Sequence, residues 1–334
     1  MKLSQARDRA SLNILLITAT RIGDAVLSSG VIAELAARHP GARFTIVCGA
    51  PPAPLFEMAP NLDRLIVTEK KPLHSHWLVL WAAVARKRWD SVYDLRGSAI
   101  ARLLWARHRV IGRHRDESIH RVAELGQLTG MFPPPAPRLW LSQQDREIAR
   151  SLMPDDPPVL ALGPTANWGG KQWPAQQFAD LAKQATEDGG VLPGAAVAVL
   201  GAGFERGMAG PVLESLPKCR CIDLIGQPLR IAAACIERST LYVGNDSGLM
   251  HIAAAVGTPT LGLFGPSSEI RYGPWGDHGA AVRTPESHKE IVLADGFDHL
   301  SQRSLMESLT IDRVYDALDN LYASVKDAPK RGNT

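Results

Sequence analysis

Four stretches of the sequence carry charged or hydroxyl side chains where a short apolar run is followed by a helical pattern. The first is TATRIGD, which ends in a glycine and the carboxylate of Asp24. An aspartate at such a turn can act as a general base that takes a proton from a reacting hydroxyl group. Capping and the helix dipole also favour an aspartate in the first turn of a helix, so both interpretations stay open.

The second stretch, GPTANWGGKQWP at residues 163–174, combines the groups that a phosphate needs. Its glycines free the backbone, Thr165 supplies a hydroxyl, and Lys171 supplies a cation beside the exposed amides of a helix start. The GxxxxGKS or GxxxxGKT pattern of a Walker loop is absent. A long surface loop with a solvated lysine is the alternative interpretation.

The third stretch is LGAGFE, which ends a predicted strand and places Glu205 at the start of the next helix. A carboxylate there can accept hydrogen bonds from ribose hydroxyl groups. Gly201, Gly203 and Gly207 have GxGxxxG spacing, and such glycine patterns are weak indicators on their own. A plain tight turn explains them equally well.

The fourth stretch, residues 243–268, begins VGNDSGLMH and ends GPSS. Asp246 and Ser247 follow a predicted strand, and a helix rich in alanine begins at Gly248. Small residues let this helix pack close to a sheet while its amino end faces a ligand. His251 is either a structural histidine with satisfied hydrogen bonds or a direct ligand contact.

The elements that position these stretches alternate between short β-rich runs and helical patterns, which is typical of parallel sheets with crossover helices. Ligands bind such sheets where the carboxyl ends of strands meet the amino ends of helices. In the first half we expect strands at residues 13–18, 44–48, 65–68 and 92–95, and a helix at 24–38. In the second half we expect strands at 159–162, 195–200, 222–224, 241–243 and 259–264, and helices at 175–187, 231–237, 248–256 and 310–323.

The chain length of 334 residues exceeds what one hydrophobic core usually supports, so two domains are expected. Four prolines between Met131 and Leu141 indicate a stiff connector. We therefore predict a first domain at residues 1–150 and a second at 151–334. The last predicted helix is placed so that it can pack back on the first domain.

Charge is unevenly distributed along the chain, although the net charge is only +3. Residues 1–140 hold 20 Lys and Arg against 11 Asp and Glu, whereas residues 141–334 hold 17 against 23. A basic half suggests an anionic partner, and a chance excess on solvated faces is the alternative. The start of the chain lacks the apolar core of a secretory signal and the cysteines form no disulfide framework, so a cytoplasmic protein is expected.

Together, the four stretches resemble glycosyltransferase family 9, the ADP-heptose:lipopolysaccharide heptosyltransferases, from about Leu12 to Gly276. The segment DSGLMH with the following GPSS carries most of the resemblance, and KQWP and RIGD support it. The resemblance implies an α/β protein of the GT-B fold, in which two Rossmann-like domains face each other across a cleft. The first domain would bind the acceptor and the second the donor. An inverting mechanism without a metal or cofactor is also implied.

The resemblance also implies a role for each matching residue. Asp24 corresponds to the general base, and Lys171 with Thr165 stabilises the charge on the departing diphosphate. The remaining positions bind the donor or the acceptor: Glu205 (ribose), Gln227 (purine), Asp246 (transferred sugar), Ser247 and Gly248 (phosphates), His251 (donor), and Arg21 and Arg96 (acceptor). The chain departs from the family pattern at Ala166, where a second hydroxyl residue is usual, and at Gln227, where a thioether or threonine often stands.

The implied function is transfer of a heptose or related sugar from an ADP-sugar to an anionic glycan or glycolipid acceptor, such as a lipopolysaccharide core. It would take place in the cytoplasm, with peripheral contact to the inner membrane and without nucleic acid. A nucleotide-sugar-binding regulator or partner subunit without turnover is the alternative. A nicotinamide-dependent dehydrogenase is disfavoured, because no GxGxxG follows the first strand.

The segment from Trp77 to Trp89 places tryptophans beside a basic cluster, so it could rest on a lipid surface. A core helix with a basic end is the favoured interpretation. Several nearby arginines are further candidates for contact with acidic groups of the acceptor: Arg102, Arg107, Arg109, Arg113 and Arg115.

Overall fold

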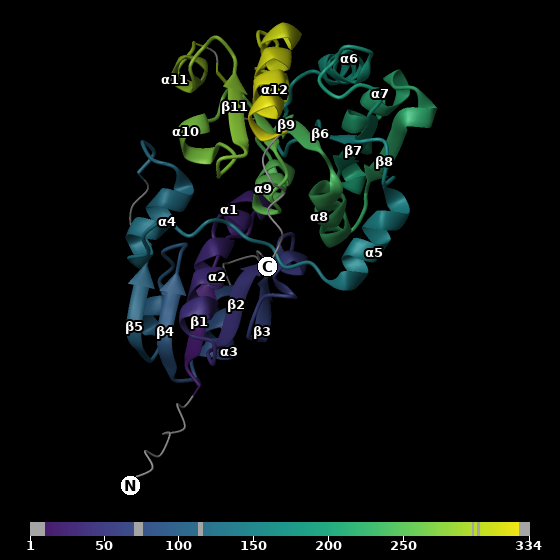
Figure 1. The fold of residues 1–334 in the computed structure, drawn as a ribbon. Helices are drawn as coiled ribbons and strands as arrows, with labels where there is room; N and C mark the ends of the chain where they lie inside the picture. The colour runs from purple at the N-terminus through teal and green to yellow at the C-terminus, as the bar shows by residue number, and fades with distance from the viewer. Residues whose placement is uncertain (1–10, 70–75, 113–115, 296, 299–300, 327–334) are drawn as a thin grey trace.

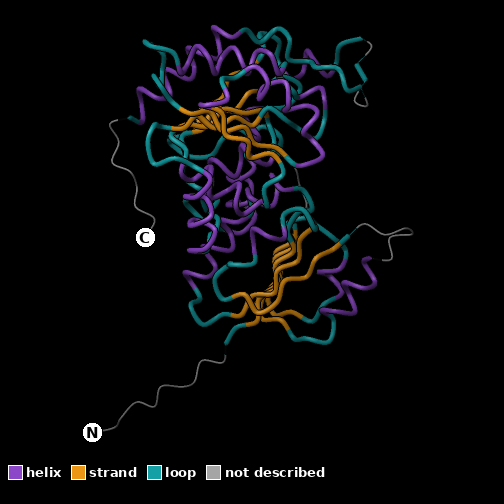
Figure 2. Tube along the Cα trace, turned by 90° about the vertical axis from the view of Figure 1, so that its right-hand side faces the viewer, coloured by secondary structure: helices purple, strands orange, loops and turns teal. Residues whose placement is uncertain are grey.

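The computed structural model of the chain describes residues 11–69, 76–112, 116–295, 297–298 and 301–326. It contains two parallel β-sheets, each packed between layers of buried apolar residues. The sheets lie one above the other in Figure 1, and Figure 2 shows the two groups of strands with helices between them. The expected α/β fold of two facing units is therefore confirmed.

The first sheet has five strands in the order β3-β2-β1-β4-β5. The strands are β1 (Asn13–Ile17), β2 (Arg43–Gly49), β3 (Leu62–Thr68), β4 (Trp89–Asp94) and β5 (Ala106–Ile111). The helices of this unit are α1 (Ile22–Leu27), α2 (Ser29–Arg38), α3 (His76–Val84) and α4 (Arg121–Thr129), with the 3-10 turns η1 (Ala53–Phe56) and η3 (Ile100–Leu103). The sequence does not predict β5, because exposed arginines and a histidine interrupt its apolar pattern.

The helix predicted at residues 24–38 is in fact two helices, α1 and α2, with a break at Ser28. The hydroxyl of Ser28 donates to the carbonyl of Ala25 at 2.8 Å and lies 2.5 Å from the hydroxyl of Thr18. A serine that bonds back to an earlier carbonyl competes with the regular helical hydrogen bonds. As a result, Asp24 lies on a separate short helix directly after β1.

The second sheet has six strands in the order β11-β10-β9-β6-β7-β8. The strands are β6 (Val159–Gly163), β7 (Ala196–Gly201), β8 (Cys221–Ile225), β9 (Leu241–Asn245), β10 (Thr260–Phe264) and β11 (Gly279–Arg283). The helices are α5 (Gln143–Leu152), α6 (Ala175–Thr186), α7 (Arg206–Ser215), α8 (Leu229–Arg238), α9 (Gly248–Ala255), α10 (Glu269–Tyr272), α11 (His288–Val292) and α12 (Ile311–Val325). Three 3-10 turns complete the unit: η4 (Gly169–Lys171), η5 (Gly203–Glu205) and η6 (Lys218–Arg220).

The strand order of each sheet reverses at one point, between β1 and β4 in the first and between β6 and β9 in the second. Open α/β sheets bind ligands in the crevice outside the carboxyl ends of the strands at such a point. Asp24 follows β1, the loop with Lys171 follows β6, and Asp246 follows β9. The topology therefore places these three residues at the two crevices.

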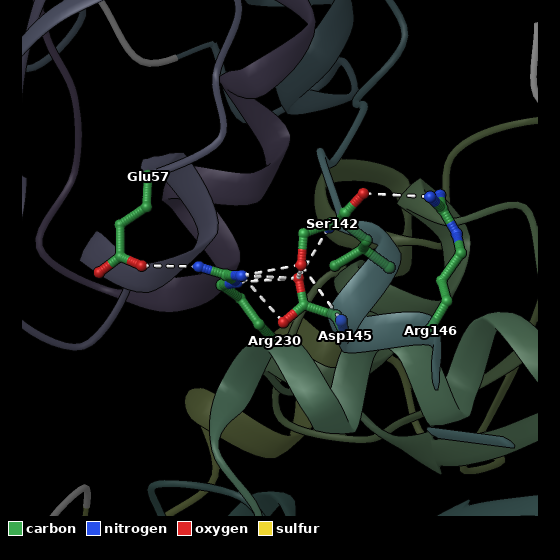
Figure 3. A network of polar contacts seen from close by, with 6 residues as sticks. Glu57, Ser142, Asp145, Arg146 and Arg230 are labelled. Atoms are coloured by element: carbon green, nitrogen blue, oxygen red, sulfur yellow. Dashed lines mark hydrogen bonds and ion pairs between the residues drawn. The ribbon is translucent and has the colours of Figure 1, made fainter. Parts of the chain in front are cut away.

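Helix α5 belongs with the second unit, although most of it precedes the predicted boundary at residue 150. It packs against α8, and Ser142 caps it through reciprocal bonds with Asp145. Arg230 of α8 bonds Asp145 at 2.7 Å and reaches Glu57 of the first unit at 2.8 Å, as Figure 3 shows. Residues 143–152 therefore pack with the second unit.

The last helix, α12, lies on the second unit (Figure 1). It contacts α6, β10 and β11, and its buried side chains Val314, Leu318 and Leu321 join the core of that unit. Since this apolar stripe is already covered there, the described part of the helix does not pack back on the first domain, contrary to the prediction.

Candidate active site between the two units

Helices α1 and α9 meet where the two units come together (Figure 1). A Cβ atom added to Gly23 would lie 2.7 Å from Cδ2 of His251. One added to Gly248 would lie 2.7 Å from Cγ2 of Ile22. Distances this short would force the two helices apart, so the glycines allow the close contact. The approach brings the amino end of α1, with Asp24, toward His251 of the second unit.

Three charged groups surround the imidazole of His251. Asp246 is buried, and its Oδ2 forms an ion pair with Nζ of Lys171 at 2.5 Å. Its Oδ1 lies 3.8 Å from Nε2 of His251. Burial lowers the pKa of His251, while Asp246 and Asp24 act to raise it and Lys171 acts to lower it. The ring is therefore neutral at pH 7 and lies within the electrostatic reach of both units.

Asp24 is half-buried and lines a cavity of about 1460 Å³. Among the described residues, no donor makes a hydrogen bond or ion pair with its carboxylate. Arg21, at the N-cap of α1, makes no side-chain capping bond. The carboxylate is thus available to a ligand in the cavity, as the prediction of a general base requires.

The loop that carries Lys171 is held in place by Asn245, which the motif contains but for which we predicted no role. Asn245 donates from Nδ2 to the carbonyl of Pro164 at 2.8 Å and accepts at Oδ1 from the amide of Trp173 at 3.0 Å. The buried indole of Trp173 donates to the carbonyl of Leu309 at 2.8 Å. A fully buried amide in an apolar strand is the signal that marks Asn245 as a supporting residue.

A segment remote in sequence supports the same loop. The indole of Trp168 donates to the carbonyl of Ser301 at 2.8 Å, and the hydroxyl of Ser304 donates to the carbonyl of Gln172 at 2.6 Å. A Cβ atom on Gly169 would lie 2.1 Å from the carbonyl oxygen of Gln302, so this position needs glycine. Nothing in the local sequence identifies residues 301–304 as part of the site.

Thr165 and Glu205, two predicted donor-binding residues, touch each other. The hydroxyl of Thr165 donates to Oε2 of Glu205 at 2.8 Å, and the amide of Ala202 donates to the same oxygen at 2.8 Å. The amide of Gly226 donates to the carbonyl of Gly201 at 2.9 Å, so the turn before Gln227 lies beside the turn that carries Glu205. All these groups lie at the carboxyl ends of β6, β7 and β8.

Two buried polar atoms, Oγ of Ser267 and Nδ1 of His251, have no hydrogen-bond partner among the described residues. The hydroxyl of Ser247 faces the buried hydroxyl of Tyr242. Ser247 and Gly248 form the start of the helix, and Ser247 makes no capping bond. Buried polar groups are nearly always paired, so such a cluster at a helix amino end suits an anionic ligand. Ser267, within the GPSS segment, is a candidate that we did not predict.

The predicted acceptor residues Arg21 and Arg96 both line the cavity with Asp24. Arg121 and Arg271 line it as well, and the sequence did not identify them. Arg271 of the second unit donates to Glu124 of the first at 2.8 Å, and Arg121 bonds the same carboxylate. Because Arg271 and Glu124 are 147 positions apart, no local pattern connects them.

Other arginines suggested for the acceptor have structural partners. Arg109 donates to the carbonyls of Ala101 and Leu104, and Arg107 lies 3.6 Å from Asp90. Arg102 is exposed outside the residues that line the cavity. Arg113 and Arg115 lie outside the described residues.

Two parallel-sheet units with charged groups from both at their meeting point are the arrangement of a GT-B glycosyltransferase. A family model, glycosyltransferase family 9 (heptosyltransferase), matches residues 61–295. This chain belongs to that family, and it is a glycosyltransferase.

Relatives and solved structures agree with this assignment. The lipopolysaccharide heptosyltransferases 2 of Salmonella typhimurium and Escherichia coli are each 26% identical, covering 93% of this chain and 98% of theirs. The structure of a family 9 glycosyltransferase from Veillonella parvula superposes with a TM-score of 0.75 at 22% identity, covering 93% of this chain and 97% of that one. The E. coli ADP-heptose lps heptosyltransferase II gives 0.74 at 22% identity, with 94% and 100% covered.

Among the described residues, no helix has the length and apolar character needed to cross a bilayer. No group of three or more histidine, cysteine or carboxylate side chains in the same residues is arranged to hold a metal ion.

Proposed function

We propose that this chain transfers a heptose or related sugar from an ADP-sugar to an anionic acceptor of the lipopolysaccharide-core type, with inversion at the anomeric carbon. The names of the relatives support the acceptor class, and one structural neighbour is described as an ADP-heptose enzyme. The observation that carries the proposal is the convergence of Asp24 from one unit with Lys171 and Asp246 from the other around His251.

In the proposed reaction, the acceptor hydroxyl attacks the anomeric carbon of the donor sugar from the side of the first unit. Asp24 takes the hydroxyl proton as the new carbon–oxygen bond forms. The bond to the diphosphate breaks on the opposite face of the carbon, and ADP leaves with the bonding electron pair. A single displacement of this kind inverts the configuration.

The second unit stabilises the charge that develops on the departing diphosphate. Lys171, the first amides of α9 and the hydroxyls of Ser247 and Ser267 are the groups available for this. Lys171 is paired with Asp246, and a diphosphate carries more negative charge than one carboxylate, so it competes for the ammonium group. Asp246 can then accept hydrogen bonds from the transferred sugar. Because the lysine supplies the positive charge, we propose no metal or cofactor.

The nucleoside part of the donor is assigned to the turns after β7 and β8. Glu205 uses Oε2 for Thr165 and Ala202, and no donor among the described residues bonds Oε1. That oxygen can accept from the ribose hydroxyls. Gln227, on the neighbouring turn, is the residue that we propose for contact with the purine.

A lipopolysaccharide-type acceptor would be a glycolipid with acidic groups. The cavity beside Asp24, where we propose that the acceptor binds, is lined by the cationic side chains of Arg21, Arg96, Arg121 and Arg271. We therefore propose that the protein works at the cytoplasmic face of the inner membrane. Nucleic acid has no part in this proposal.

The test is to incubate the protein with ADP-heptose and a core acceptor that lacks the heptose, and to measure ADP release and the mass of the acceptor. We expect stoichiometric product with unchanged rate in the presence of a chelator. UDP- and GDP-sugars serve as controls and should not raise the melting temperature. Binding of ADP-heptose without any transfer to core acceptors would favour the regulator, and a rate that depends on added Mg²⁺ or Mn²⁺ would contradict the metal-free mechanism.

A further inference from the structure

Helix α3 is apolar on its outer face as well as on its inner face. Leu80 and Val84 are buried against the first sheet, at 2% and 1% exposure. Leu78, Val79 and Trp81 lie 71%, 61% and 42% exposed on the same nine-residue helix. A surface helix in water normally carries polar residues on its outer face, so this exposed face needs an explanation.

A neighbouring segment adds to the same surface. Leu103 in the turn η3 and Trp105, the residue before β5, are each 69% exposed. Their buried neighbours Ile100 and Leu104 pack in the same core cluster as Leu80 and Val84. The two segments therefore cover one face of the first sheet, and we call their exposed apolar side chains the α3 patch: Leu78, Val79, Trp81, Leu103 and Trp105.

Basic side chains surround the α3 patch. Arg86, Arg88 and Arg102 are exposed, and the guanidinium of Arg88 lies 4.9 Å from the ring of Trp105. The nearby carboxylates Asp63 and Asp90 are already neutralised by Lys or Arg partners. The surface is thus apolar at its centre and positively charged at its rim.

We propose that the α3 patch docks this protein on an anionic lipid surface. Leucine and tryptophan side chains insert at the boundary between headgroups and acyl chains, and the basic rim binds the negative headgroups. A helix of nine residues is too short to span a bilayer, so it lies along the surface. A second copy of the chain fits poorly as the occupant, because two positively charged rims would face each other.

The α3 patch is linked to the catalytic cavity at one end of the helix. Trp77, in the first turn of α3, lies with its ring centre 5.2 Å from the guanidinium of Arg96, which lines the cavity with Asp24. A docked protein would hold this side of the cavity near the lipid headgroups, where a glycolipid acceptor presents its sugars. The docking surface does not depend on the donor chemistry, so vesicle binding and sugar transfer can be tested separately.

The first experiment is co-sedimentation of the full chain with phosphatidylcholine vesicles and with vesicles rich in phosphatidylglycerol. We expect binding to the anionic vesicles only, weakened in about 0.5 M salt by screening.

Leu78→Glu with Val79→Glu should lower the partition coefficient at least tenfold. Arg86→Gln, Arg88→Gln and Arg102→Gln together should lower it about a hundredfold, at roughly fivefold per charge. The control is Leu293→Glu, at an apolar position 78% exposed on the second unit, and it should bind as the wild type does.

The second experiment is quenching of tryptophan fluorescence by lipids brominated on their acyl chains. Quenching should occur in the wild type and fall when Trp81 and Trp105 are both replaced by phenylalanine. Any of three results would overturn the docking proposal: vesicle binding that these substitutions do not change, no binding to either vesicle type, or self-association that Leu78→Glu abolishes. Transfer to a detergent-free, water-soluble core fragment should stay at the wild-type rate in all these variants. If the wild-type protein binds vesicles but does not transfer sugar to this soluble fragment, the result contradicts the proposed function and leaves the docking proposal standing.

Discussion

Lys171 and Asp246 form an ion pair of 2.5 Å, although they are 75 positions apart in the chain. They follow β6 and β9, which are neighbours because the strand order of the second sheet reverses between them. The Asp246 side chain is 6% exposed and that of Lys171 is 24% exposed. Each therefore neutralises a charge that would be costly to bury alone.

The first prediction separates the structural role of this pair from its catalytic role. Lys171→Met should lower the free energy of unfolding by about 1 to 3 kcal/mol, because it leaves the Asp246 carboxylate buried without a cation. Adding Asp246→Asn should restore most of that loss, but transfer should stay abolished. Denaturant unfolding and ADP release measure the two effects. A double variant as unstable as the single one would show that the pair does not act as described.

Asp24→Asn should reduce the transfer rate by about 10² to 10⁴, the usual contribution of a general base. The amide keeps the size of the side chain but cannot take the acceptor proton. The shift in melting temperature produced by the ADP-sugar should remain, because the proposed donor site lies on the second unit. Asp188→Asn, at an exposed position in the second unit, is the matched control and should transfer normally. Equal loss of donor binding in Asp24→Asn would place Asp24 in the donor site instead.

Gly23→Ala should separate α1 from α9, since the new methyl group would lie 2.7 Å from the His251 ring. We expect a loss of about 1 to 3 kcal/mol in stability from overpacking. Displacement of the neighbouring Asp24 by even 1 Å should reduce transfer by about a hundredfold. The control is Gly41→Ala in the turn before β2, where no atom outside the flanking residues lies within 4 Å of the new Cβ and φ is not in the left-handed region. It should stabilise the protein by about 0.5 to 1 kcal/mol and leave transfer unchanged.

His120 should make the protein less stable at mildly acidic pH. It accepts at Nδ1 from the amide of Val122 in the first unit, and its Nε2 lies 2.9 Å from the carbonyl of Gly273 in the second. Burial lowers the pKa of His120 from 6.5 to about 4. The unfolded chain therefore binds a proton between these values that the folded protein excludes, so stability is full above pH 6.5 and falls as the pH drops toward 4.

Between pH 7 and pH 5 this amounts to about 1 to 2 kcal/mol. His120→Asn keeps a capping side chain without the titration, so it should remove that part of the pH dependence. Identical curves for the wild type and His120→Asn would show that the half-buried His120 does not cause the loss of stability at low pH.

Local composition predicts most strands, because parallel strands buried on both faces are continuous apolar runs. Both β6 and β9 are of this kind, with every residue buried. Edge strand β5 has exposed residues on both faces, so a search for continuous apolar runs does not find it. Local composition also does not predict the helix break at Ser28, because the break involves the hydroxyl of Thr18, which only the fold brings within 2.5 Å of the Ser28 hydroxyl.

The sequence determines which groups stand at each strand end, and so the carboxylates, the lysine and the small-residue helix of the proposed transfer site could be named in advance. Tertiary structure decides which of them share one place: Asp24 approaches His251 through two glycines, and Arg271 meets Glu124 from 147 positions away. It also decides that α5 and α12 pack with the second unit. The physical reason is the distance along the chain over which each interaction acts. The period of a helix or strand depends on neighbours a few residues apart, whereas contacts between the two units depend on how whole faces pack.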